Sequence, residues 1–259
     1  MTNTFKQRLQ AREPLLGLWN NLSSPAATEI VSSSPFDFAC IDCEHAPNDY
    51  AEVLEQLRAM GRENCVPVVR PAWNDMVVIK RLLDIGVRNF IVPHIETADM
   101  AAAAVRFTRY PPAGVRGVGS ITRATGYGRR RDYASEANDS MCVLALVETR
   151  LGIENLRDIA ATDGIDAVVI GASDLAADMG HLGQPYHPEV VGMVERDIAA
   201  ALRAGKIAVS VSAAQEHTRR HGMLGCTVFI VGMDTALLAN AVDQKAAEFA
   251  FLKKSGGAT

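Results

Sequence analysis

The sequence predicts an α/β fold with a single domain, a (β/α)8 or TIM barrel. Eight short apolar runs without polar alternation occur along the 259 residues, as expected for parallel strands that are buried on both faces. Segments with helical periodicity lie between most of these runs, and eight β/α units in about 250 residues are typical of the barrel, because an open doubly wound sheet usually has fewer strands. No linker or low-complexity tract divides residues 1–259, so we expect one domain.

The apolar runs define the predicted strands. They cover residues 15–19, 36–42, 65–70, 89–93, 141–148, 165–171, 206–211 and 226–232. The least regular parts are the first unit, where residues 25–31 allow only a short helix, and the connection 107–140. A connection of that length without clear periodicity is usually functional or mobile.

Two of the predicted helices have capping-box signals at their start. Asp49 and Glu52 have this spacing ahead of an apolar stripe. Ser212 and Gln215 have the same spacing ahead of a helix that we expect to end near Gly222.

Composition excludes several classes of protein. Lys and Arg number 26 against 30 Asp and Glu, a net charge of −4, so no large basic field is present to bind nucleic acid. No run approaches the roughly 20 apolar residues of a membrane helix, and the first residues lack the apolar stretch of a signal peptide. The five cysteines are odd in number and lie mostly in apolar runs, which is typical of reduced thiols. We therefore expect a cytoplasmic protein that binds neither membranes nor nucleic acid.

Polar residues gather where the predicted strands end. In a barrel of this kind the carboxyl ends of the strands carry the chemistry. The residues at or just beyond these ends are Asp42, Glu44, His45, Arg70, His94, Glu96, Glu148 and Asp174. An apolar strand gains no packing energy from a terminal charge, so we interpret these residues as a functional ring.

Glu148 and Asp174 follow two consecutive strands and could offer two hard oxygen ligands to Mg²⁺ or Mn²⁺. The alternative is that each carboxylate caps a helix or forms an ion pair. Arg70 could bind a carboxylate or an oxyanion through its fork of donors, or it could simply neutralise the neighbouring acids.

His45 lies three residues beyond Asp42, close enough for the carboxylate to orient the imidazole as a general acid or base. His94 is expected only to line the pocket. The remaining histidines are expected to be solvated: His181, His187, His217 and His221. No lysine is predicted to be buried near a strand end, which disfavours Schiff-base chemistry, so any enolate would depend on a metal and an arginine.

Three further motifs are weak signals of function. Cys40 and Cys43 have CxxC spacing but lie in a buried run without a second pair, which favours core packing over zinc or redox chemistry. The glycines of residues 114–119 resemble a phosphate-binding loop but follow no predicted strand. The arginines at 129–131 lack interleaved aromatic residues, which favours a solvated loop or a subunit contact over RNA binding.

The chain resembles the HpcH/HpaI aldolase family of metal-dependent pyruvate aldolases over nearly its whole length. The segments that carry the resemblance are 17–19, 36–37, 41–49, 67–71, 109–119, 147–149 and 171–180. The resemblance implies reversible cleavage of a 4-hydroxy-2-oxo acid, through an enolate, into an aldehyde and pyruvate or a related 2-oxo acid such as hydroxypyruvate. It also implies that Glu148 and Asp174 bind Mg²⁺, Mn²⁺ or Co²⁺, that Arg70 lies against the enolate oxygen, and that Asp42 and His45 form the acid/base dyad.

The same resemblance implies roles in substrate binding and assembly. The backbone around Gly171, Ala172, Ser173 and Asp174 would receive the pyruvate carboxylate. Trp19 and Val211 would line the aldehyde side of the pocket, and Asp84 would reach the site of a neighbouring subunit. A homo-oligomer, expected to be a hexamer, would pack the C-terminal helix of residues 234–254 on a partner.

Four residues depart from the pattern common in relatives, and they bear on the identity of the substrate. These residues are Cys43, His94, Leu146 and Ser173. Two other interpretations remain open: a carbon–carbon lyase acting on a CoA thioester, as in the citrate lyase branch, and a barrel that binds a 2-oxo acid without converting it.

Overall fold

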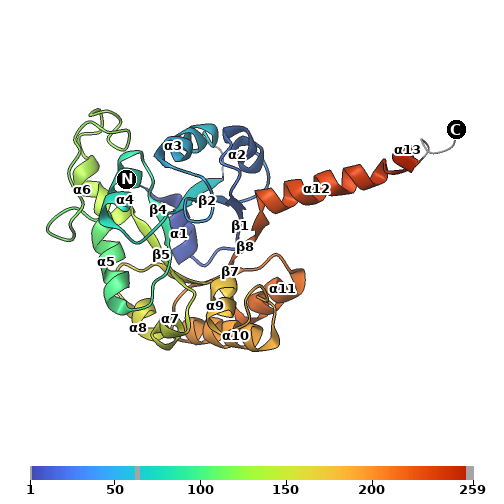
Figure 1. The fold of residues 1–259 in the computed structure, drawn as a ribbon. Helices are drawn as coiled ribbons and strands as arrows, with labels where there is room; N and C mark the ends of the chain where they lie inside the picture. The colour runs from blue at the N-terminus through green and yellow to red at the C-terminus, as the bar shows by residue number, and fades with distance from the viewer. Residues whose placement is uncertain (1, 62–64, 255–259) are drawn as a thin grey trace.

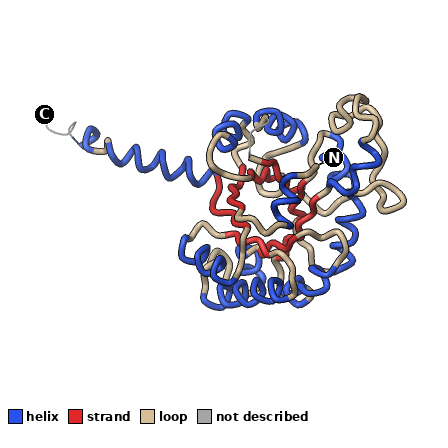
Figure 2. The backbone as a smooth tube through the Cα atoms, turned by 180° about the vertical axis from the view of Figure 1, so that it is seen from behind, coloured by secondary structure: helices blue, strands red, loops and turns tan. Residues whose placement is uncertain are grey.

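Eight parallel strands close into a barrel in the computed structural model, which describes residues 2–61 and 65–254. The strands are β1 (Leu15–Asn20), β2 (Phe38–Asp42), β3 (Val66–Arg70), β4 (Asn89–Val92), β5 (Cys142–Val147), β6 (Ala167–Ile170), β7 (Ala208–Val211) and β8 (Val228–Met233). Each strand pairs with the next in sequence, and β1 pairs with β8. Figure 2 shows the strands as an inner ring with the helices outside it. The predicted (β/α)8 barrel is confirmed.

Most helices surround this ring, but the first helix lies across one end of it and the C-terminal helices extend away from it (Figure 1). The helices are α1 (Thr4–Gln10), α2 (Pro25–Ser32), α3 (Tyr50–Ala59), α4 (Met76–Asp84), α5 (Ala98–Thr108), α6 (Tyr133–Ala137), the 3₁₀ turn η1 (Asn138–Ser140), α7 (Arg150–Glu154), α8 (Leu156–Ala161), α9 (Ala172–Asp178), α10 (Pro188–Arg203), α11 (Gln215–Leu224), α12 (Asp234–Glu248) and α13 (Phe251–Lys254). Among the residues described, no helix combines the length and apolarity needed to cross a membrane.

One end of the barrel is closed by apolar side chains. Phe5 and Leu9 of α1 are buried and join the same cluster as the inward-facing residues of the strands. The rings of Phe5 and Phe38 meet edge to face, with centroids 5.3 Å apart. A Cβ at Gly17 would lie 2.2 Å from the Phe38 ring, so this packing requires glycine there. Because α1 fills the amino-terminal end, a ligand must enter from the carboxyl ends of the strands.

One of the two predicted capping boxes is confirmed and the other is wrong. Asp49 caps α3 with Glu52 as its reciprocal partner. In contrast, α11 begins at Gln215 with Ala214 as its N-cap and no side-chain cap, because Ser212 instead accepts the N–H of Ala214 in a local turn. This helix continues past the expected end near Gly222 and stops at Gly225, which adopts a left-handed conformation with φ of 110°.

The predicted irregular connection is a long loop, residues 109–132, between α5 and α6. The buried guanidinium of Arg116 holds it together: it lies over the ring of Tyr110 and donates to the hydroxyl of Tyr133 at 3.0 Å. At the surface of the same loop, Val118 and Ile121 are each 75% exposed.

Candidate active site

A cavity of about 630 Å³ lies at the carboxyl ends of the strands. Side chains from β1, β3, β5, β7 and β8 and from the segments that follow the strands form its wall. They are Trp19, Asn21, His45, Pro47, Arg70, Leu146, Glu148, Gly171, Ala172, Ser173, Asp174, Val211, Met233 and Thr235. The structure therefore brings most of the predicted site residues together. Asp42 lies directly behind Arg70, whereas Asp84 lies elsewhere.

Arg70 and Asp42 form a buried ion pair at the base of this cavity. They are the last residues of neighbouring strands and are register partners. Arg70 donates from Nε and Nη2 to the two oxygens of Asp42, both at 2.8 Å. Burial acts to raise the pKa of Asp42, but the hydrogen bonds and charge of Arg70, with backbone N–H donors, outweigh it and hold this pKa below its usual value. Asp42 is therefore ionised at neutral pH and fixes the orientation of Arg70.

The third guanidinium nitrogen of Arg70 has its own partner. Its Nη1 lies 3.0 Å from Oε2 of Glu44, and its Cζ lies 4.3 Å from the centroid of the Trp19 ring. Two carboxylates and one aromatic face thus hold the guanidinium plane in one position. Arg70 therefore neutralises the neighbouring acids, which was one of the two interpretations of the sequence. It also lines the cavity, where it can contact a ligand.

His45 lies at the edge of the same cavity, with 58% of its side chain exposed. Its Nε2 is 3.7 Å from Oε2 of Glu44. The carboxylate of Asp42 accepts instead from Asn21 Nδ2 at 2.8 Å and from the backbone N–H groups of Glu44 and His45. Asp42 thus anchors the backbone of this turn, and the nearest described carboxylate to the imidazole is that of Glu44. The role of His45 as acid or base remains a prediction.

Glu148 is a buried carboxylate that faces the cavity. Thr149, not Glu148, caps α7, so the capping alternative does not hold for Glu148. Its Oε1 accepts the backbone N–H of His94 at 2.9 Å. The pKa of Glu148 is raised to about 7, mainly by burial, with smaller contributions from the negative charges of Glu44 and Asp174 and against the lowering effects of the His94 bond and the charge of Arg70. Glu44 and Asp174 therefore both repel the charged form of Glu148.

Gly171 makes room for the Glu148 carboxylate. A Cβ at position 171 would lie 2.8 Å from both Cβ and Oε2 of Glu148. Gly171 also precedes α9, whose first turn carries Asp174 and has no side-chain cap. Asp174 is exposed at the cavity wall and does not cap this helix.

Several wall residues were not predicted to have a role. Asn21 is one of them, and its Nδ2 donates to Asp42. Met233, the last residue of β8, and Thr235, just beyond it, are two others. The signal that could have found all of them is position, because each stands at or just beyond a strand end.

Asp84 is the last residue of α4 and does not line this cavity. Its Oδ1 lies 3.9 Å from Nη2 of the buried Arg116. The predicted contact of Asp84 with the site of another subunit remains a prediction.

The Cys40 and Cys43 thiols are free and do not form a reactive pair. Burial, with a contribution from the charge of Asp42, raises the pKa of Cys43 to about 12, and burial raises that of Cys40 as well. Both thiols therefore stay protonated, in agreement with core packing.

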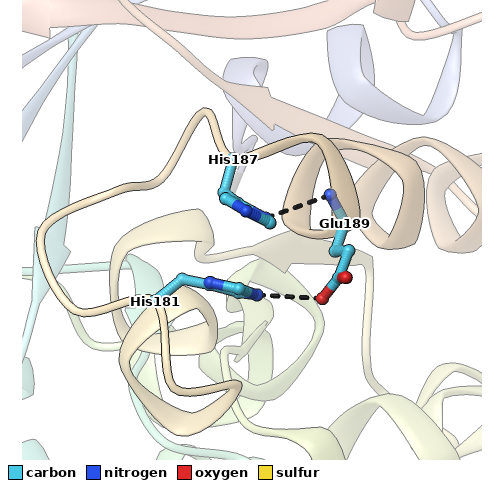
Figure 3. A group of neighbouring side chains, drawn as sticks. All are labelled: His181, His187 and Glu189. Atoms are coloured by element: carbon cyan, nitrogen blue, oxygen red, sulfur yellow. Dashed lines mark hydrogen bonds and ion pairs between the residues drawn. The ribbon is translucent and has the colours of Figure 1, made fainter.

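The remaining histidines correct one expectation. His221 is buried, not solvated, and its Nδ1 is 2.8 Å from the hydroxyl of Ser210. Figure 3 shows a second group, on the segment between α9 and α10, in which the rings of His181 and His187 stack with centroids 3.6 Å apart. His181 hydrogen-bonds to the Glu189 carboxylate, and His187 Nδ1 accepts the Glu189 N–H as the cap of α10. These three residues could offer ligand atoms within 4.8 Å of one another, but their internal hydrogen bonds already explain the grouping.

Comparison with known proteins identifies the family. Residues 15–241 match the family model described as HpcH/HpaI aldolase/citrate lyase. The chain belongs to this family. The 4-hydroxy-2-oxo-heptane-1,7-dioate aldolase of Shigella flexneri is 47% identical over 250 residues, which cover 96% of this chain and 94% of that protein. The structure of an HpcH/HpaI aldolase/citrate lyase family protein from Burkholderia cenocepacia J2315 superposes with a TM-score of 0.92 at 40% identity and covers 96% of this chain and 100% of that one.

Of the four residues expected to bear on the identity of the substrate, Leu146 and Ser173 line the cavity. The expectation that His94 lines the pocket is wrong: His94 is not part of the wall, and its backbone N–H donates to Glu148. The His94 ring stacks on Trp73, with centroids 5.2 Å apart. Cys43 follows Asp42 directly. The effect of these four residues on the identity of the substrate remains a prediction.

Proposed function

We propose that this protein is a class II aldolase that reversibly cleaves a 4-hydroxy-2-oxo acid into pyruvate, or a related 2-oxo acid such as hydroxypyruvate, and an aldehyde. The observation that carries the proposal is the convergence of Glu148, Asp174 and Arg70 on one cavity at the carboxyl ends of the strands. Membership of the HpcH/HpaI family and the 47% identity to a 4-hydroxy-2-oxo-heptane-1,7-dioate aldolase support the reaction class.

The residues present fit a divalent cation. Glu148 and Asp174 supply hard oxygen donors, and their mutual repulsion, which helps to raise the pKa of Glu148, would be relieved by a bound positive charge. Such a cation, Mg²⁺, Mn²⁺ or Co²⁺, would polarise the carbonyl of the 2-oxo acid and stabilise negative charge in the transition state. The cavity wall has no lysine among its described residues, so the chain offers no Schiff-base route there.

The protein's own groups account for the other requirements of the reaction. Arg70, held rigid by Asp42 and Glu44, presents positive charge to the oxygen on which the enolate charge develops. The uncapped N–H groups at the start of α9 favour an anionic carboxylate. Trp19 and Val211 give the aldehyde side an apolar wall.

His45 is the group we assign to proton transfer. It lines the cavity yet is largely exposed, so it can take the proton of the C4 hydroxyl, directly or through water, and pass it to solvent. When this proton leaves, the C3–C4 bond breaks, the aldehyde departs, and the electron pair remains as the enolate of the 2-oxo acid. Asp42 acts through the backbone of this turn and through Arg70.

The direct test is release of pyruvate from 4-hydroxy-2-oxo-heptane-1,7-dioate, measured with Mg²⁺, Mn²⁺ or Co²⁺ and again with EDTA. We expect cleavage that requires the cation. Cleavage at an unchanged rate in the presence of EDTA would overturn the mechanism. Pyruvate binding without exchange of its methyl protons in D₂O would instead favour a barrel that binds a 2-oxo acid without converting it.

Gly171→Ala tests the placement of the carboxylate. The added methyl group must displace Glu148, so we expect cation affinity to fall roughly 10- to 100-fold, as for changes that misorient a metal ligand. Isothermal titration with Mn²⁺ measures it. Gly192→Ala in α10 is the matched control, because a Cβ there meets no atom within 4 Å. Equal affinities in the two variants would contradict the proposed site.

We further propose that the chain forms a homo-oligomer, with a hexamer as the expected state, in which Asp84 approaches the site of a neighbouring subunit. Apart from its buried first residue, α12 extends away from the barrel (Figure 1). Its apolar side chains Leu237, Leu238 and Val242 are all more than half exposed. A partner subunit would bury this apolar face.

Leu238→Glu should shift the protein to a smaller assembly, because it places a charge in that apolar contact. Light scattering coupled to size exclusion measures the mass. Asn240→Glu makes the same change of charge at an exposed polar position of α12 and should leave the mass unaltered. A monomeric wild-type protein would refute the oligomer.

A further inference from the structure

A second cavity, of about 340 Å³, lies at the opposite end of the barrel from the candidate active site. Three arginines from two segments line it: Arg88 immediately before β4, and Arg123 and Arg130 in the loop of residues 109–132. The other lining residues are Thr2, Gly86, Ala124 and Tyr133, so its described wall contains no carboxylate. Three positive groups therefore face one space.

Backbone carbonyls hold two of these guanidinium groups in place, and an aromatic ring lies beside the third. Arg123 Nη1 donates to the carbonyl of Ile85 at 2.7 Å, and a Cβ at Gly86 would lie 2.8 Å from that nitrogen. Arg88 Nη1 donates to the carbonyl of Thr2 at 2.9 Å. Arg130 lies with its Cζ 5.6 Å from the centroid of the Tyr133 ring. These contacts fix the positions of the charges but do not neutralise them.

The charge at this cavity has little compensation from the residues that the structure describes. In residues 2–61 and 65–254, no carboxylate lies within ion-pair distance of Arg88, Arg123 or Arg130, in contrast to Arg70 with its two acids. Glu136 is the acid that interacts with Arg130, and it lies in the adjacent depression formed by residues 129–133. Burial, together with the charge of Arg130, lowers the pKa of Arg88.

We propose that this cavity binds a small oxyanion of the phosphate class. Guanidinium groups present planar forks of donors that match phosphate oxygens, and an anion here would relieve the repulsion among the three arginines. The ion would also join the 109–132 loop to the barrel, because Arg88 belongs to the turn before β4 and the other two to the loop. Its role is independent of the proposed aldolase reaction, whose residues lie at the other end.

The test is titration of the full-length protein with inorganic phosphate at constant ionic strength, read by calorimetry and by thermal stability. We expect saturable binding and stabilisation in the wild type, and at least roughly tenfold weaker binding in Arg88→Gln, from loss of one charged bidentate contact. Arg129→Gln removes the same charge outside the cavity wall and should bind as the wild type does. A phosphomonoester titrated in parallel distinguishes free phosphate from a phosphorylated metabolite as the preferred ion.

Equal binding by the wild type and Arg88→Gln would overturn the proposal, as would no binding by the wild type. A change in assembly mass in Arg88→Gln would also overturn it, since it would assign these arginines to a contact with a second copy. If Arg88→Gln does not fold, the site can be tested by soaking tungstate into crystals of the wild-type protein. We expect an anomalous peak among the three guanidinium groups. The absence of this peak would refute the site.

Discussion

Glu148→Gln should leave the fold intact and abolish the cation-dependent reaction. The amide keeps the volume of the side chain and an oxygen to accept the His94 N–H, but it removes the charge that would bind the cation. We expect Mn²⁺ affinity to fall by roughly 100-fold or more, and kcat/KM for pyruvate release by roughly 1,000-fold, as expected when a metal that stabilises the transition state is lost. Calorimetry measures the first quantity and a coupled pyruvate assay the second.

The wild-type protein supplies the internal check on this prediction. Because its pKa is raised to about 7, Glu148 is largely protonated below that pH, and a proton must leave before a cation can bind. Mn²⁺ affinity should therefore weaken as the pH falls through about 7, and this dependence should flatten in Glu148→Gln. Glu216→Gln, at an exposed position on α11, is the matched control. Unchanged Mn²⁺ binding by Glu148→Gln would exclude this carboxylate as a ligand.

The barrel, and the end of the barrel that carries the site, could be predicted from the sequence because both depend on the local pattern of apolar residues. Apolar runs of strand length locate the strands, and parallel closure places every strand end on one face. Asp42 and Arg70 could therefore be expected to meet, and their register pairing shows the reason.

Which side chains of the site pair with each other depends on the directions in which they point. The spacing of residues in the sequence does not determine these directions. His45 lies only three positions beyond Asp42, yet the carboxylate turns toward Arg70 and Asn21, because the bidentate guanidinium contact offers stronger compensation for a buried charge. The capping box of Ser212 failed for a similar reason, since a local turn competes for its hydroxyl. The cavity of Arg88, Arg123 and Arg130 joins segments that only the folded chain brings together.

Arg70→Met should be strongly destabilising as well as inactive. Asp42 is 0% exposed, and loss of its bidentate partner leaves a buried charge with only Asn21 and backbone donors. Breaking one side of a buried pair costs about 3–5 kcal/mol in the free energy of unfolding. Loss of the charge beside the developing enolate should lower kcat by roughly 100- to 1,000-fold. Urea denaturation and the pyruvate assay measure the two effects.

The pH dependence of stability tests the cause. In the wild type the lowered pKa of Asp42 contributes stability that is fully present above the unfolded-state pKa and is lost as the pH falls from that value through the lowered one. Without Arg70, burial dominates and raises this pKa above its unfolded value, so Arg70→Met should lose stability as the pH rises from acid to neutral. The double variant Asp42→Asn with Arg70→Met removes the unpaired charge and should recover stability at neutral pH but not activity. If both variants were equally unstable at neutral pH, lost packing against Trp19, not the charge of Asp42, would be the cause.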